Sequence, residues 1–300
     1  MSNAHGLADR FEPHREHLRG VAYRMLGSLP DAEDAVQEAW LRFMRADVGE
    51  IRNLAGWLTT VVSRICLDAL RSRSARREDL VGGHEADEHV DRSRTAQPEQ
   101  EAVLVDEIGR ALLVVLETLS PAERVAFVLH DMFAVPFDEI APVLERSADT
   151  TKKLGSRARL KVRGTPTVDA AVLASHRRTV ETFLAASRSG DVAAILGVLA
   201  PDVVRRADQL ALPPGRATRV SGARVVAEEV AVFGARSRYA AAALINGDVG
   251  IVVAPQGRLQ LVLAVEFVGE RIAAYELIAD PARLGVLALA DLPGDCSVRL

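Results

Sequence analysis

The chain has 300 residues, 41 acidic and 37 basic, and a formal net charge of −4. About half of its residues are hydrophobic, which suits about two packed domains and excludes global disorder. No run approaches the roughly 18 apolar residues that span a bilayer, and the first residues lack the apolar core of a secretion signal. The only cysteines, Cys66 and Cys296, are too few for a disulfide framework or a multi-cysteine zinc site. We therefore expect a cytoplasmic protein without a metal or another cofactor.

The first half of the chain has the apolar spacing of helices. Residues 8–46 form two such stretches, separated by a break at 27–30. A third helix is predicted from about Leu54 to Leu70, and it is followed by a run of arginines. We expect these helices to form one domain over 8–77. The next segment, 78–99, loses helical periodicity and is predicted to be a linker.

A second helical domain is predicted over 100–163. Ser120, Pro121 and Glu123 have the spacing of a helix start with a capping box. Residues 136–163 predict two short helices joined by a tight turn, with Ser147 capping the second helix and Ala158 and Val162 facing the core. This is the pattern of a helix-turn-helix, which presents its second helix to the major groove.

The charge of the second helix of this pair favours DNA binding. Six basic residues and no acidic one lie between 152 and 163, although the whole chain is slightly acidic. Lysine and arginine neutralise phosphates, and serine and threonine can donate to them. An ordinary solvated basic hairpin is the alternative for this segment. The candidate DNA-binding residues here are Ser147, Thr150, Thr151, Lys152, Lys153, Ser156, Arg157 and Arg159.

The last 130 or so residues combine helical with strand-like apolar spacing. Residues 168–200 read as helical, and from about 239 the apolar period approaches two. Four strands are predicted at 239–246, 249–254, 259–268 and 271–279, and their short turns favour antiparallel pairing. We expect a separate α+β domain over 168–290.

Three blocks of the chain resemble known families. The segment Asp31-Ala32-Glu33-Asp34-Ala35-Val36-Gln37-Glu38-Ala39-Trp40-Leu41-Arg42 and the segment from Trp57 to Arg71 resemble region 2 of extracytoplasmic-function (ECF) sigma factors. Leu119-Ser120-Pro121-Ala122-Glu123-Arg124 and the helix-turn-helix resemble region 4. The segment from Arg177 to Ala186, with Gly190-Asp191, resembles SnoaL/NTF2-like domains. The order of the blocks is similar to the sigma factors that carry a fused SnoaL-like domain, so an all-α half is expected to precede an α+β cone.

This resemblance implies the partners of the chain. They are promoter DNA and the core of RNA polymerase, through the β′ clamp helices and the β flap, and no membrane. The −35 element would meet residues 147–159, and the −10 element would meet the helix that carries Arg64, Arg71 and Arg73. The C-terminal domain would modulate activity in cis. The polymerase-binding residues would lie on an acidic face that comprises Asp31, Asp34, Gln37 and Glu38.

The alternative to a transcription factor is a protein that acts on or senses a small molecule. The C-terminal domain could be a SnoaL-like enzyme or a small-molecule sensor, with the N-terminal helices serving only to dock it. Enzymes of this shape work with buried carboxylates and a tyrosine or histidine. The candidates are Asp202, Asp208, Glu266 and Tyr275, and no histidine follows His176. Fold analogy does not establish chemistry, so we expect no enzymatic activity and leave a ligand open.

Overall fold

The computed structural model describes residues 2–46, 51–81 and 109–293, and it divides the chain into two compact units. From residue 82 onward the predicted linker lies outside the described residues, as does Cys296. Of the described residues, one unit contains those up to 81 and residues 119–160. The other contains 109–118 and 161–293. Within the described residues, no helix is long and apolar enough to cross a membrane.

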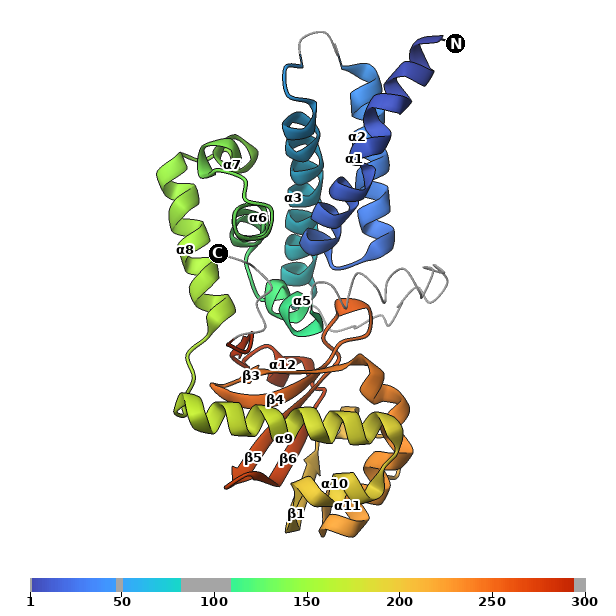
Figure 1. Cartoon of the computed structure of the whole chain (residues 1–300), viewed down its shortest axis with the longest axis vertical. Coiled ribbons are helices and arrows are strands. Elements are labelled where there is room, and N and C mark those ends of the chain that lie inside the picture. The colour runs from blue at the N-terminus through green and yellow to red at the C-terminus, as the bar shows by residue number, and fades with distance from the viewer. Residues whose placement is uncertain (1, 47–50, 82–108, 294–300) are drawn as a thin grey trace. The chain divides into compact units, whose positions relative to one another are not determined.

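Three long helices open the first unit and pack against one another (Figure 1). They are α1 (Ser2–Leu26), α2 (Leu29–Arg45) and α3 (Leu54–Val81). Ser28 caps α2 through its side chain, which accepts from the Asp31 backbone N–H at 3.4 Å. The buried apolar stripe of α2 recurs at the spacing expected of one helix face, at Ala32, Ala35, Val36, Ala39 and Phe43. The predicted helical first half is therefore confirmed.

The remaining helices of the first unit include the predicted helix-turn-helix. They are α6 (Pro121–Phe127), the π-helical turn η2 (Val128–Met132), α7 (Phe137–Leu144) and α8 (Ala148–Arg163), whose last three residues fall in the second unit. The capping box of α6 is present, because Ser120 and Glu123 exchange hydrogen bonds of 3.1 and 3.4 Å. Glu145 ends α7 with a left-handed backbone (φ 55°), and this turns the chain toward α8.

The second unit is an α+β domain built on a seven-stranded sheet. Its strand order is β2-β1-β6-β5-β4-β3-β7, and every pair is antiparallel except β1 with β6. The strands are β1 (Leu199–Ala207), β2 (Arg219–Ser221), β3 (Ala240–Ile245), β4 (Asp248–Val253), β5 (Leu261–Val268), β6 (Arg271–Ile278) and β7 (Leu289–Ala290). The four predicted strands correspond to β3–β6. The helices are α9 (Ala170–Ser189), α10 (Val192–Val198), α11 (Ala223–Phe233) and α12 (Pro281–Leu284).

The sheet has two apolar faces, because successive residues of a strand point to opposite sides. In β4, Ile251 joins a core with α9, α10 and α11, whereas Val252 joins a second core on the other face. This second core includes Ala111 and Val114 of α5 (Arg110–Glu117). The sequence predicts that 100–163 forms one domain, and this range stays a prediction. The contacts, however, group α5 with the sheet.

Candidate nucleic-acid interface and C-terminal cavity

One face of α8 is buried and the opposite face is exposed. The buried stripe consists of Thr151, Gly155, Ala158 and Val162, at helical steps of three and four. A β-carbon at Gly155 would lie 2.9 Å from the Phe137 ring of α7, so glycine permits the close approach of these helices. The exposed side therefore carries most of the polar and charged residues, and it includes Asp149, Lys152, Lys153, Ser156, Arg157 and Leu160.

Most of the predicted DNA-binding residues of α8 lie on this exposed side. Lys152, Lys153 and Arg157 make no ion pair with any described residue, so their charges face solvent. Ser147 is exposed and caps the helix, accepting from the backbone N–H of the half-buried Thr150 at 3.3 Å. We name the surface formed by Ser147, Thr150, Lys152, Lys153, Ser156 and Arg157 the α8 basic face.

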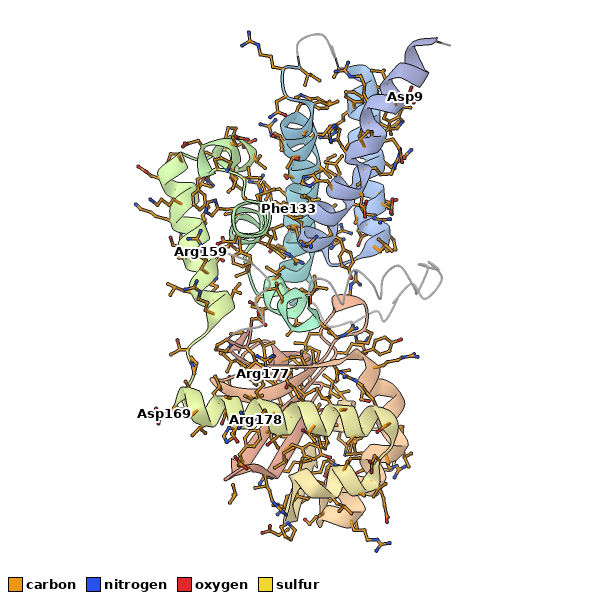
Figure 2. The ribbon with its side chains drawn as sticks, in the orientation of Figure 1. Asp9, Phe133, Arg159, Asp169, Arg177 and Arg178 are labelled. Carbon is orange, nitrogen blue, oxygen red and sulfur yellow. The ribbon has the colours of Figure 1, made fainter. Side chains whose placement is uncertain are left out.

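Two residues predicted for DNA binding are used inside the unit instead. Thr151 is fully buried, and its hydroxyl donates to the Ser147 carbonyl at 3.0 Å. Arg159 lies on α8 (labelled in Figure 2). Its guanidinium pairs with Asp131 of η2 at 2.5 Å, and the Asp131 side chain is only 6% exposed. A buried carboxylate needs a partner charge, which makes Arg159 structural. We therefore remove Thr151 and Arg159 from the DNA-binding set.

Of the arginines of α3, one is likewise paired within the fold and others are exposed. Arg73 donates to the Leu26 carbonyl at 3.1 Å and to Asp31 at 2.6 Å, so it joins the end of α1 to the start of α2. Both partners of the Arg73–Asp31 pair were predicted site residues, one for DNA and one for polymerase. This contact gives both side chains a role within the fold, and we therefore leave both out of the proposed contact surfaces. Arg71 is exposed and lies 3.9 Å from Asp68, whereas Arg64 is exposed and donates to the Pro142 carbonyl at 3.0 Å.

The rest of the predicted acidic face lies on α2. Asp34 and Gln37 are exposed, and the half-buried Glu38 pairs with Arg42 at 2.9 Å. Surface pairs of this i,i+4 type contribute little to stability, so Glu38 can exchange its partner at low cost. The acidic face that remains is Asp34, Gln37 and Glu38.

The candidate residues for the alternative enzymatic function do not converge on one site. Asp202 is exposed, and Glu266 pairs with Arg206 at 3.0 Å on the surface. Burial raises the pKa of Asp208, but hydrogen bonds from the backbone N–H groups of Asp280, Ala279 and Ala211 outweigh this effect and lower it. These bonds connect the end of β1 to the segment after β6. Asp208 is therefore a structural carboxylate.

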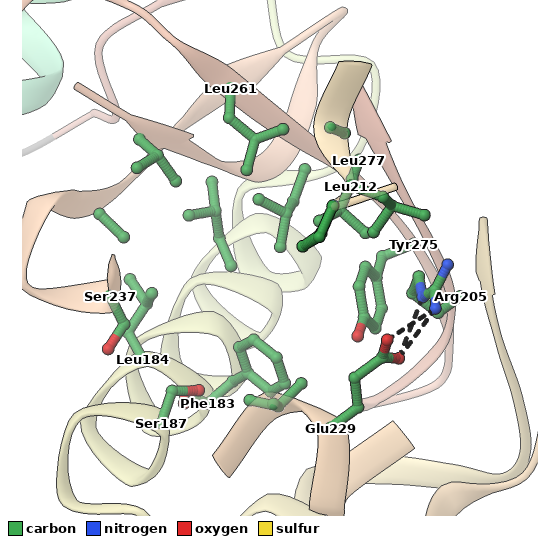
Figure 3. A pocket seen from close by; sticks show the side chains of 17 residues that line it. Phe183, Leu184, Ser187, Arg205, Leu212, Glu229, Ser237, Leu261, Tyr275 and Leu277 are labelled. Carbon is green, nitrogen blue, oxygen red and sulfur yellow. Dashed lines mark hydrogen bonds and ion pairs between the residues drawn. The ribbon is translucent and has the colours of Figure 1, made fainter. Parts of the chain in front are cut away.

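Tyr275 does line a cavity, together with two residues that the sequence analysis missed. The cavity measures about 120 Å³, and its walls are mainly apolar side chains of α9, β4 and β5 (Figure 3). Arg205 of β1 and Glu229 of α11 form a buried ion pair at 2.8 Å on its wall. Neither β1 nor α11 was predicted, so no pattern in the sequence indicated this pair. Among the described residues, no three His, Cys, Asp or Glu side chains gather as metal ligands would.

Comparisons with known proteins identify the two helical segments. Residues 10–76 match Sigma-70 region 2, and residues 109–162 match Sigma-70, region 4. The chain is 39% identical over 252 residues to the ECF RNA polymerase sigma factor SigJ of Mycobacterium tuberculosis, covering 81% of this chain and 80% of that protein. It is also 39% identical over 211 residues to the probable ECF RNA polymerase sigma factor SigI of the same species, covering 69% of this chain and 72% of that protein. The crystal structure of SigJ matches over 93% of this chain and 98% of that one, with 31% identity and a TM-score of 0.44.

Arg159 is paired within the fold and Arg157 is exposed, so replacing each of them should affect stability differently. We expect Arg159→Ala to lower the free energy of unfolding by about 2 kcal/mol, because the buried Asp131 carboxylate loses its partner. Arg157→Ala should change it by less than about 0.5 kcal/mol, as is usual for an exposed side chain. Urea unfolding of the two variants measures the difference. Equal losses in both would contradict the assignment of Arg159 to the fold.

Proposed function

Since the chain belongs to the ECF RNA polymerase sigma factors, we propose how its residues divide the work of promoter recognition and polymerase binding. The observation that carries the proposal is the α8 basic face. Its lysines and its arginine are exposed, while Thr151 and Ala158 hold the opposite side of α8 in the core. We assign this face to the −35 element, and the exposed Arg71 of α3 to the −10 element.

The mechanism requires no covalent step. Cations that meet DNA phosphates release counterions, which supplies affinity that falls with salt. A few side chains that reach base edges then supply sequence selection. Within the α8 basic face, the hydroxyls of Thr150 and Ser156 can contact phosphate or a thymine methyl, and Lys153 and Arg157 can contact phosphate or guanine. We infer a cytoplasmic location, because such a subunit acts on chromosomal DNA.

The acidic face on α2 is the proposed contact with core polymerase. Asp34, Gln37 and Glu38 carry negative charge and amide groups that DNA would repel or leave unused. A basic protein surface complements them, because opposite potentials steer association and fix its register. Asp31 is outside this contact, since Arg73 holds it in the fold.

The C-terminal domain is the proposed modulator of the sigma core in cis. Support comes from α5, which lies inside the range matched by region 4 but packs on the sheet of the C-terminal domain. Arg110 of α5 also donates to the Ala254 carbonyl at 2.9 Å. A change in this sheet would therefore reach a helix of the promoter-binding part. We propose no catalysis in this domain, because Asp202, Asp208 and Glu266 do not share a site.

Replacing Arg157 tests the α8 basic face. With holoenzyme assembled from the full chain, Arg157→Ala should weaken promoter binding, and the slope of log affinity against log salt should fall by about one if a phosphate contact is lost. Binding titrations at several salt concentrations measure both quantities. Arg178→Ala, which removes an exposed arginine of α9, is the matched control and should leave the slope unchanged. An unchanged slope for Arg157→Ala would remove this residue from the DNA face.

Charge reversal tests the acidic face. The double variant Asp34→Lys with Glu38→Lys should bind core polymerase at least about tenfold more weakly, because like charges would meet at the interface. Asp202→Lys with Glu228→Lys reverses two exposed carboxylates of the C-terminal domain and serves as the control. Co-purification and a titrated binding assay compare the three proteins. Undiminished association of the α2 variant, with its fold intact, would refute the assignment.

A further inference from the structure

The cavity of the C-terminal domain is apolar over most of its wall. It lies between the inner face of the sheet and the helices α9 and α11, and its aliphatic lining includes Leu184, Ile251, Leu261 and Leu263. Concave apolar surfaces with a few polar groups are the usual form of small-molecule sites. The polar groups of the wall therefore decide which ligand fits.

The charges on the wall cancel. Arg205 is 2% exposed and holds the Glu229 carboxylate in a bidentate arrangement, with contacts of 2.8, 3.0 and 3.2 Å. Its remaining terminal nitrogen donates to the Ala217 carbonyl at 2.7 Å. Arg205 has its donors engaged, so an incoming anion would have to compete with Glu229. An incoming ammonium group would compete with Arg205 for the same carboxylate.

The Tyr275 hydroxyl makes no hydrogen bond to any residue that the structure describes. Tyr275 is 4% exposed, and its hydroxyl points toward the Glu229 carboxylate (Figure 3). No hydrogen bond joins this hydroxyl to any residue drawn there. Burial, followed by the charge of Glu229, raises the pKa of Tyr275, so the hydroxyl keeps its proton and can donate. Ser187 differs, because its hydroxyl already donates to the Phe183 carbonyl at 2.6 Å.

We propose that this cavity binds a neutral, largely apolar small molecule that carries one hydroxyl group. The ligand hydroxyl accepts a hydrogen bond from Tyr275 and donates one to the free lone pairs of Glu229, while the rest of the molecule replaces water against the aliphatic wall. Neutrality follows from the Arg205–Glu229 pair, since a net charge on the ligand would be buried without a counter-charge. Binding is reversible and involves no bond making or breaking. The inference goes beyond the proposed function and does not depend on transcription.

The test uses 2-naphthol as the probe and the full chain as the protein. Isothermal titration calorimetry compares 2-naphthol with 2-naphthoate, which has the same ring system and a negative charge. We expect saturable binding of 2-naphthol and at least about tenfold weaker binding of 2-naphthoate. Tyr275→Phe removes only the hydroxyl and should weaken 2-naphthol binding about fivefold, as expected for one hydrogen bond.

Two further variants test whether changes in 2-naphthol binding are specific to the cavity. Tyr239→Phe removes a tyrosine hydroxyl outside the cavity lining and should leave binding unchanged. Leu261→Trp fills the cavity from β5 and should abolish binding, while thermal unfolding reports whether the fold is kept. The proposal is overturned if the wild-type chain does not bind 2-naphthol up to its solubility limit. It is also overturned if 2-naphthoate binds equally well, or if a folded Tyr275→Phe or Leu261→Trp variant binds as the wild type does.

Discussion

The packing of α8 against α7 is the contact on which the proposed DNA interface depends. Gly155 lets the Phe137 ring approach the helix, and Ala158 and Val162 continue the buried stripe. Because a helix has fixed geometry, burying this side forces Lys152, Lys153 and Arg157 to the opposite side. No separate interaction has to orient them. The position of the small residues in α8 therefore determines which cations DNA can reach.

A cation in a basic helix can equally serve the fold, and the sequence alone does not distinguish the two uses. Arg157 and Arg159 are two positions apart on α8, yet one faces solvent and the other pairs with Asp131. Periodicity correctly placed Ala158 and Val162 in the core, and the same period excludes Thr151 from the surface. What periodicity could not supply was Asp131, which reaches Arg159 only through the packing of η2. The Arg73–Asp31 pair is a similar case, because 42 positions separate its members.

In the C-terminal domain, too, sequence patterns predict some elements, while others become visible only in the folded structure. Strands β3–β6 could be predicted, since their apolar residues alternate and short Gly-containing turns separate them. Strand β1 and helix α11 were not predicted, and they supply Arg205 and Glu229. Tyr275 was named as a candidate from the sequence, but its surroundings depend on those two elements. The two faces of the sheet also explain why α5 groups with this domain: Ala111 and Val114 cover apolar residues that would otherwise be exposed to water.

The proposed promoter recognition requires the exposed side of α8 to contact DNA in the initiating complex. Site-specific photo-crosslinking tests it most directly. A photoreactive amino acid replaces Arg157 in one protein and Leu160, on the same exposed side, in another, and Arg178 in a third serves as a control. Each protein is assembled with core polymerase on a template that supports run-off transcription. We expect crosslinks from 157 and 160 to the DNA near the −35 position and none from 178. Crosslinks from 157 and 160 to protein alone, in complexes that still initiate, would contradict the proposed contact.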